Sequence, residues 1–196
     1  MKLYYAPGAC SLADHIALIE AGSDYTLEKV DLKAKKTETG ADYLDINPKG
    51  YVPALALDDG AVLTENIAIL GYIADAAHAL EPAGSLARFR SLETTAFVST
   101  ELHKNFKPFF NPAASDAERD EAKQVLAKRF AIVEAQLGDQ PFLFGEGVSV
   151  ADCYLFVMLF WATKRGVEVG KPLEAYYARM RARPAVVRAF AEEGLD

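Results

Sequence analysis

The chain has 196 residues, of which 51% are hydrophobic and 25% are charged, and this composition is typical of a globular protein with one or two domains. Its net charge of −7 argues against general binding to nucleic acid, which requires a basic surface. Two cysteines are too few for a disulfide scaffold and favour a reducing compartment, so we expect a cytoplasmic protein. No leader pattern precedes Lys2 and no uncharged apolar run approaches 18 residues, so we expect neither secretion nor a membrane partner.

The first half of the sequence alternates strand and helix patterns. Strands and helices are predicted in the order βαβ, a connecting segment and then ββα, over residues 2–5, 11–21, 25–31, 54–57, 61–64 and 65–77. Ser11 and Asp14 have the spacing of a helix capping box, with aspartate in the usual place of glutamate or glutamine. Asp58-Asp59-Gly60 is a hairpin signal between the last two strands.

The second half shows no strand pattern of note. Pro82 and Gly84 mark a linker over residues 79–85. Helices are predicted over residues 86–107, 116–137, 149–163 and 173–183, with a last helix that starts near Pro184. Residues 1–78 carry a net charge of −6 and residues 79–196 only −1. We therefore expect an α/β domain over 1–78, the linker 79–85 and an all-helical domain over 86–196.

Two features of the helical half predict core structure. A stripe at three- and four-residue spacing follows the first long helix through Phe89, Leu92, Ala96, Phe97, Thr100, His103 and either Phe106 or Lys107. Ser149 and Asp152 predict a second capping box, again with aspartate in place of glutamate or glutamine. The aromatic residues of that helix are expected to fill the core; these are Tyr154, Phe156, Phe160 and Trp161. Alternatively, a few of them line an apolar pocket together with Phe106, Phe109 and Phe110.

Cys10 directly precedes the helix predicted to start at Ser11. A thiol at a helix N-terminus lies near unpaired N–H groups and the positive end of the helix dipole, and both favour the nucleophilic thiolate. We therefore expect the pKa of Cys10 to lie below the free value of about 8.5. Ala13 stands where a second cysteine of a Cys-x-x-Cys pair would be, which excludes a disulfide cycle within this motif. From position alone, a reactive thiol and a small buried hydrophobic residue are equally good interpretations.

The order of elements, with Cys10 after the first strand and Pro53 before the third, resembles the thioredoxin fold. Followed by an all-helical domain, it is similar to the cytosolic glutathione transferases, and in particular to the bacterial beta class, which carries a cysteine in this place. The matching segments span nearly the whole chain: residues 1–11, 35–37, 47–53, 64–65, 100–104, 149–152 and 193–195. None of these motifs is decisive alone, and it is their order and spacing together that carry the resemblance.

The resemblance implies how the first domain binds glutathione. In the family the bond before Pro53 is cis, and Val52 then presents its N–H and C=O to the cysteinyl backbone of glutathione, as an added strand would pair. Glu65 and Asn66 open a helix whose N–H groups suit the γ-glutamyl carboxylate. Lys35 is the residue expected to meet the glycine carboxylate.

Some positions depart from the family pattern or extend it. Asn66 stands where the family often has a small residue or serine, although its backbone N–H serves equally. Lys36 is the neighbouring alternative to Lys35. Tyr51 and Lys104, within matching segments, are further candidate substrate-binding residues.

His103 is the second candidate catalytic residue after Cys10. A lone histidine on an apolar stripe is more often a core residue, but in the beta class a histidine at this place faces the glutathione sulfur, where it donates a hydrogen bond or moves a proton. The family often has an asparagine about two helical turns earlier, and here that position is Ala96. His15 and His78 are interpreted as structural, and three scattered histidines indicate no metal site.

The resemblance implies a detoxifying, homodimeric glutathione transferase that conjugates its co-substrate glutathione to small apolar electrophiles, with possible thiol exchange through a mixed disulfide at Cys10. Two alternatives are open: a glutathione-dependent reductase or dehalogenase on the same scaffold, and a non-catalytic protein that binds apolar ligands. The joint presence of Cys10, Val52-Pro53, Glu65 and His103 argues against the second alternative, which needs no sulfur chemistry.

Overall fold

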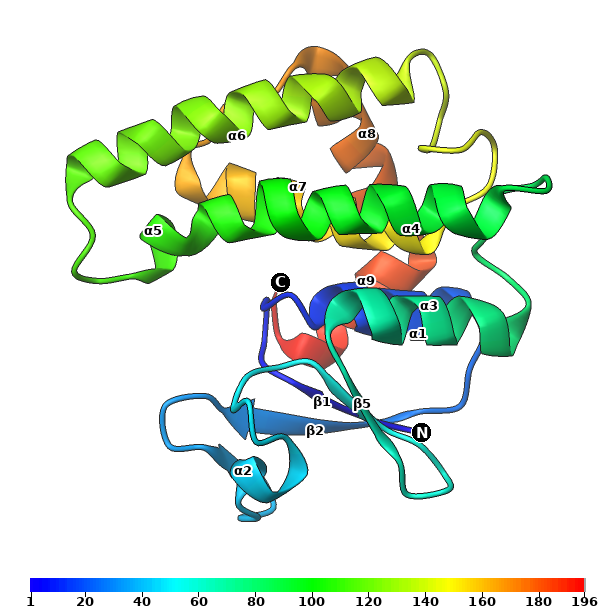
Figure 1. Cartoon of the computed structure of the whole chain (residues 1–196), viewed down its shortest axis with the longest axis vertical. Helices are drawn as coiled ribbons and strands as arrows, with labels where there is room; N and C mark the ends of the chain where they lie inside the picture. The colour runs from blue at the N-terminus through cyan, green and yellow to red at the C-terminus, as the bar shows by residue number, and fades with distance from the viewer. Residues whose placement is uncertain (196) are drawn as a thin grey trace. The chain divides into compact units, whose positions relative to one another are not determined.

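The computed structural model describes residues Met1–Leu195, which form two compact units (Figure 1). The first unit comprises Met1–Leu80 together with the described residues from Arg183 on, and the second comprises Glu81–Ala182. The last helix, α9 (Pro184–Glu193), therefore belongs to the first unit and not, as the sequence suggested, with the other helices of the second half. No helix in the described part of the chain is long and apolar enough to cross a membrane.

A mixed five-stranded sheet is the centre of the first unit. It contains β1 (Lys2–Tyr5), β2 (Thr26–Asp31), β3 (Lys36–Thr37), β4 (Ala54–Ala56) and β5 (Val62–Thr64), in the spatial order β3-β2-β1-β4-β5. β1 pairs in parallel with β2 and antiparallel with β4, and β4 pairs antiparallel with β5. The four predicted strands are confirmed. The sequence did not predict β3, because two residues are too few to carry a strand pattern.

Helices cover both faces of this sheet. α1 (Leu12–Glu20) and α3 (Asn66–Ala77) pack together on one face, and α2 (Tyr43–Ile46) lies on the other (Figure 1). Successive residues of a strand point to opposite faces, so a sheet covered on both sides buries neighbours in the sequence. Leu3 and Tyr4 of β1 are accordingly both buried, and Tyr4 packs against Tyr43 of α2.

The predicted capping box of Ser11 and Asp14 is wrong. The Ser11 backbone is already helical, with φ −58° and ψ −19°, and its side chain makes no cap hydrogen bond. The Ser11 hydroxyl instead accepts from the N–H of Ala6 at 3.3 Å and contacts the Ala6 carbonyl at 3.4 Å. The serine is therefore used to hold the chain that leaves β1, and Asp14 is buried in the first turn without a capping role.

Packing and an ion pair explain why α9 joins the first unit. Its apolar face buries Val186, Ala189 and Phe190, and α9 packs against α1. At the start of α9, Arg183 forms a two-pronged ion pair with Glu20 at the end of α1, with Nε–Oε1 2.5 Å and Nη2–Oε2 2.9 Å. Arginine–carboxylate pairs of this geometry fix orientation as well as distance.

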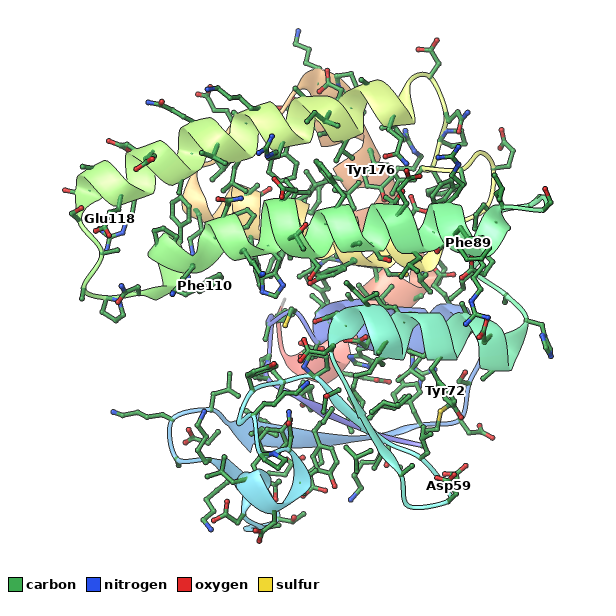
Figure 2. The ribbon with its side chains drawn as sticks, in the orientation of Figure 1. Asp59, Tyr72, Phe89, Phe110, Glu118 and Tyr176 are labelled. Atoms are coloured by element: carbon green, nitrogen blue, oxygen red, sulfur yellow. The ribbon has the colours of Figure 1, made fainter. Side chains whose placement is uncertain are left out.

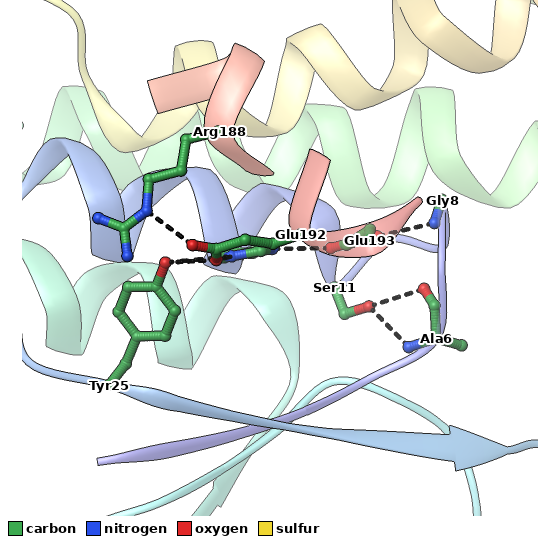
Figure 3. Close-up of polar contacts among 8 residues, drawn as sticks. Ala6, Gly8, Ser11, Tyr25, Arg188, Glu192 and Glu193 are labelled. Carbon is green, nitrogen blue, oxygen red and sulfur yellow. Dashed lines mark hydrogen bonds and ion pairs between the residues drawn. The ribbon is translucent and has the colours of Figure 1, made fainter. Parts of the chain in front are cut away.

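The end of α9 also holds the loop that precedes Cys10. His15 of α1 is fully buried, and its ring lies between Glu192 (Nε2–Oε2 2.8 Å) and Glu193 (Nδ1–Oε1 3.0 Å). The other Glu193 oxygen accepts from the N–H of Gly8 at 2.8 Å (Figure 3). The last helix of the chain is thus bonded to the first loop, two residues before the candidate thiol.

The second unit is built from helices. It contains α4 (Ala87–Phe97), a π-helical turn (Val98–Leu102), a 3₁₀ turn (His103–Phe106), α5 (Lys107–Phe110), α6 (Asp116–Leu137), α7 (Val150–Arg165) and α8 (Lys171–Arg181). The bounds of α6 match the prediction, and those of α7 and α8 lie within two residues of it. The helix predicted over 86–107 is interrupted at Val98 by the π turn. The core of the unit is α7, whose residues 150–162 are all buried, including its four aromatic residues.

The apolar stripe predicted on the first long helix is wrong at its N-terminal end. Phe89 is 64% exposed and Leu92 49% exposed, and Phe89 stands near the start of α4 (Figure 2). The buried residues of α4, which packs against α7, are Ser91, Thr94 and Thr95. Thr95 donates its hydroxyl proton to the Ser91 carbonyl at 2.9 Å. The small, internally bonded side chains are therefore buried, and the large apolar ones are left on the surface.

The capping box of Ser149 and Asp152 is confirmed. Asp152 Oδ2 accepts from the Ser149 N–H at 2.8 Å, and Ser149 Oγ accepts from the Asp152 N–H at 3.4 Å. Both residues are buried, so no water replaces these bonds when one partner is removed. The sequence pattern alone was sufficient here because the partner groups lie within one turn of helix.

Ser149→Ala should lower the free energy of unfolding by about 1 to 2 kcal/mol, the usual cost of a lost N-cap, because Asp152 also loses a buried donor at 2.6 Å. The matched control is Ser115→Ala, which removes the exposed capping box of α6 and should cost less. Urea denaturation followed by circular dichroism measures both. An unchanged midpoint in Ser149→Ala would contradict the expectation.

Candidate active site

Cys10 lies between β1 and α1 and is half-buried. Its thiol donates a hydrogen bond to the Val52 carbonyl at 3.4 Å. The Val52–Pro53 peptide bond is cis, as the resemblance implied. The side-chain amide of Asn66 donates to the Cys10 carbonyl at 2.9 Å. The structure thus brings together the thiol, the chain before Pro53 and the start of α3, three segments far apart in the sequence.

The expectation of a lowered pKa for Cys10 is wrong. Burial of the thiol, with a smaller effect from the negative charge of Asp14, raises the pKa of Cys10 to about 12. The backbone N–H groups of Cys10 and Ser11 act in the opposite direction but do not prevail. The sequence argument counted the helix N-terminus and omitted desolvation, which only the tertiary structure reveals.

Glu65 is the centre of a polar cluster at the start of α3. Its Oε1 accepts from Lys49 Nζ at 2.5 Å and from the Tyr51 hydroxyl at 2.6 Å. Hydrogen bonds from Lys49 and then Tyr51 lower the pKa of Glu65, so the carboxylate is ionised at neutral pH. Glu65 has φ +73°, a conformation that side-chain-bearing residues rarely adopt and that is concentrated at functional sites. Sequence reasoning missed Lys49; the available signal was a lysine inside the matching segment 47–53.

The two candidate lysines differ in their surroundings. Lys35 is partly buried, and its Nζ donates to the Gly50 carbonyl at 2.5 Å, next to Tyr51 in the chain. Lys36 is exposed and pairs with Asp42 at 3.1 Å. Lys35 therefore lies beside the segment that leads to Val52, whereas Lys36 is already paired with a carboxylate.

His103 belongs to the second unit, where it is the first residue of the 3₁₀ turn. Its Nδ1 is 2.7 Å from the Tyr154 hydroxyl, and its ring meets the Trp161 ring edge-on, with centroids 5.0 Å apart. Burial lowers the pKa of His103 to about 4, so the imidazole is neutral at pH 7. Lys104, next in the chain, is exposed. The roles of His103 and Lys104 toward glutathione stay predictions.

The described residues contain no group of three or more histidine, cysteine, aspartate or glutamate side chains arranged to hold a metal ion. Neither Cys10 nor Cys153 forms a disulfide, and Cys153 is fully buried in α7. The chemistry available in the first unit is therefore that of the half-buried Cys10 thiol, the backbone before Pro53 and the charged groups around them.

Comparison with known proteins identifies the family. Residues 9–76 match the glutathione S-transferase N-terminal domain and residues 116–188 the C-terminal domain. The chain is 44% identical to glutathione S-transferase GstA of Escherichia coli O157:H7, with both chains fully covered. Two solved structures cover the whole chain at a TM-score of 0.91: a sphingomonad glutathione S-transferase complexed with glutathione, 46% identical, and a bacterial beta-class enzyme from Sphingomonas chungbukensis, 45% identical.

The chain belongs to the glutathione S-transferase family, and its resemblance to the bacterial beta class is confirmed. The predicted fold, a thioredoxin-like α/β domain with an all-helical domain, is confirmed with it. The protein is a glutathione transferase, and glutathione is its co-substrate.

In the ligand-free protein, the rate of Cys10 alkylation by iodoacetamide should continue to rise with pH beyond pH 9, because a thiol with a pKa of about 12 is almost fully protonated below that. Cys153→Ala isolates the signal of Cys10, and Cys10→Ala reports the background from Cys153. Mass spectrometry of the labelled protein over pH 6 to 10 measures the rate. A plateau reached by pH 8 would contradict the raised pKa.

Proposed function

We propose that this enzyme conjugates glutathione to small apolar electrophiles, with the neutral Cys10 thiol donating a hydrogen bond to the glutathione sulfur. The observation that carries the proposal is the contact between the Cys10 thiol and the Val52 carbonyl at 3.4 Å. Val52 is the residue whose backbone would pair with the cysteinyl unit of glutathione. A ligand paired with Val52 therefore brings its own sulfur close to Cys10.

The charged groups around this contact suit the two ends of the tripeptide. At one end, the N–H groups that open α3 suit the γ-glutamyl carboxylate, and the ionised Glu65 suits the α-amino group. At the other end, Lys35 suits the glycine carboxylate. Tyr51 and Lys49 hold the Glu65 side chain in place. In this arrangement Val52 binds the middle of the ligand.

Conjugation needs little from the protein beyond orientation and stabilisation of the thiolate. The glutathione sulfur attacks the electrophilic carbon, a carbon–sulfur bond forms, and with an aryl halide the halide leaves as the thiol proton passes to solvent. The neutral Cys10 thiol donates to the sulfur anion and forms no covalent bond. The raised pKa of Cys10 supports this donor role over a nucleophilic one, since the attacking form of a thiol is the thiolate.

Thiol exchange is a second candidate activity, favoured by the fact that Cys10 is a free, partly exposed thiol. The Cys10 thiolate would attack a mixed disulfide of glutathione and a second thiol, forming a disulfide between Cys10 and glutathione and releasing the second thiol as its thiolate. A further glutathione thiolate would then attack this disulfide, which releases the Cys10 thiolate and forms oxidised glutathione. The pKa of about 12 makes this path slow at neutral pH.

An aromatic cluster in the second unit supports an apolar co-substrate. Phe110 is 49% exposed, and its ring lies 4.7 Å from that of Trp161, while Phe106 is buried between Trp161 and Phe109. Arg165 lies 5.0 Å above the Phe110 ring. We propose that Phe109 and Phe110 contact the electrophile, as apolar side chains with a few polar neighbours do in most small-molecule sites.

Steady-state assays with glutathione and an aryl halide, a mixed disulfide or a hydroperoxide test the function. We expect turnover of the aryl halide in the wild type. Cys10→Ala should keep about one fifth of it, since one missing hydrogen bond of about 1 kcal/mol costs about fivefold, and should form no glutathionyl adduct. Cys153→Ala is the matched control. Turnover of the mixed disulfide alone would favour the reductase alternative. Saturable binding of the apolar compound without turnover of any substrate would favour the non-catalytic binding protein.

We also propose that the enzyme is a cytoplasmic homodimer with a detoxifying role. Free cysteines suit a reducing compartment. Phe89 and Leu92 are exposed apolar side chains on α4, and the exposed Ile132 of α6 lines a groove of about 530 Å³ together with residues of α4. Exposed apolar side chains on one element mark surfaces that meet a partner, and a second copy of the chain offers the same side chains.

Phe89→Glu should convert the dimer to a monomer, because it introduces a charge into the proposed apolar interface. Val187→Glu, at a similarly exposed apolar position on α9, is the matched control and should leave the dimer intact. Sedimentation equilibrium measures both. A monomeric wild type, or a dimer that Phe89→Glu does not disturb, would contradict the proposed interface.

Lys35→Ala should weaken glutathione binding about two- to fivefold at low salt and less at 0.5 M salt, because a partly exposed charge pair is weak and is screened. Lys36→Ala, already paired with Asp42, should change the affinity little. Isothermal titration calorimetry measures both. A larger effect of Lys36→Ala would identify that residue as the carboxylate ligand, and no effect of either would show that neither lysine binds it.

A further inference from the structure

Two aspartates occupy the same place in the same local sequence pattern. Ser11-Leu12-Ala13-Asp14 opens α1, and Ser149-Val150-Ala151-Asp152 opens α7. Both aspartates are fully buried. Both oxygens of Asp152 accept hydrogen bonds, from Leu143 N–H, Ser149 N–H, Ser149 Oγ and Tyr176 Oη. Asp152 therefore has the surroundings of a well-satisfied carboxylate.

Asp14 has almost none of these partners. The hydroxyl of Ser11 is used by Ala6, so the serine does not serve Asp14. Asp14 Oδ2 accepts one hydrogen bond, from Asn66 Nδ2 at 2.9 Å. Asp14 Oδ1 is buried and has no hydrogen-bond partner among the described residues. A buried carboxylate with one oxygen unpaired is unfavourable, and the neutral acid is the form that avoids the cost.

The groups that face Asp14 add no cation to offset a negative charge. From α9, Glu193 brings a second negative charge, and on its own segment Cys10 brings a neutral thiol. From α3 the facing group is the uncharged amide of Asn66. His15 is next in the chain but its ring nitrogens are bonded toward α9. Burial raises the pKa of Asp14 well above its usual range, the charge of Glu193 adds to this, and the hydrogen bond from the Asp14 backbone N–H opposes it without prevailing.

Asn66 links this acid to the active thiol. Its Nδ2 donates both to Asp14 Oδ2 and to the carbonyl of Cys10, each at 2.9 Å. The Cys10 carbonyl also accepts from the N–H of Ala13, so two donors fix it. We propose that Asp14, as the neutral carboxylic acid, and Asn66 form a positioning pair that fixes Cys10 against the start of α3.

The pair sets how the thiol is placed relative to the γ-glutamyl end of glutathione, and in this respect it rests on the proposed function. Asp14 orients the Asn66 amide, and the amide holds the Cys10 main chain beside Glu65. Neither side chain touches the sulfur. Loss of the pair should therefore affect glutathione binding more than the chemical step.

The protonation of Asp14 is tested through stability and needs no glutathione. An acid whose pKa is raised by folding loses stability as pH rises from its unfolded value of about 3.9 toward its folded value. Asp14→Asn removes this loss. We expect the variant to be at least as stable as the wild type at pH 7, with a flatter dependence between pH 4 and 8. Burial raises the pKa of Asp152 as well, but its carboxylate accepts four hydrogen bonds, and an amide with a single acceptor oxygen does not replace them, so the matched Asp152→Asn should be less stable at pH 7. Destabilisation by Asp14→Asn as large as that by Asp152→Asn would overturn the neutral-acid assignment.

The positioning role is tested by the KM and kcat for glutathione in four variants. Asp14→Ala and Asn66→Ala should each raise KM about three- to tenfold with little change in kcat, and Asp14→Asn should restore the wild-type KM. The double variant Asp14→Ala/Asn66→Ala should be no worse than Asn66→Ala alone. Additive effects, or a normal KM in Asn66→Ala, would overturn the pair. A wild type that binds no glutathione in calorimetry would instead refute the proposed function, while the stability data would still decide the state of Asp14.

Discussion

Satisfaction of buried polar groups around Cys10 is the constraint on which the first unit depends. The segment from Ala6 to Cys10 is partly buried except at Pro7, and several of its N–H and C=O groups take protein partners in place of water. Those partners come from distant parts of the chain: Ser11 for Ala6, Glu193 for Gly8, and Asn66 for the Cys10 carbonyl. One consequence is that α9, the last helix, folds with the first unit, because the loop before the thiol requires its carboxylate.

Much of the fold could be predicted from the sequence, because hydrophobic periodicity and capping signals act over one or two turns. The bounds of α6 and the Ser149 capping box are of this kind. The same local pattern fails at Ser11, where a tertiary partner, Ala6, takes the serine hydroxyl. The stripe through Phe89 fails for a related reason: periodicity shows that one face of a helix is apolar, but it does not show which face meets the neighbouring helix.

The meeting of three candidate site residues was predictable from the sequence, but the charge state of the thiol was not. Cys10, Val52 and Asn66 do meet, and the sequence motif that named them carries that information. The protonation of Cys10 depends on desolvation, which no sequence spacing encodes, and desolvation raises its pKa where the sequence predicted a lowered one. The charge state of His103 likewise depends on its tertiary surroundings. The π turn over Val98–Leu102 interrupts the regular helix just before it, and such turns recur at functional sites. Its ring lies beside Tyr154 and Trp161, where burial keeps the imidazole neutral.

An uncharged thiol suits the proposed conjugation better than a reactive thiolate would. The charges that raise the pKa of Cys10 are those of Asp14 and Glu65. If Asp14 is neutral, the pKa of Cys10 is still raised, because burial of the thiol is the largest cause of the shift. A buried neutral thiol donates one hydrogen bond, here to the Val52 carbonyl. When a sulfur anion arrives, the same proton can be redirected to it without the cost of bringing two negative charges together in a desolvated site. The negative charge then enters with glutathione, and the protein contributes the donor.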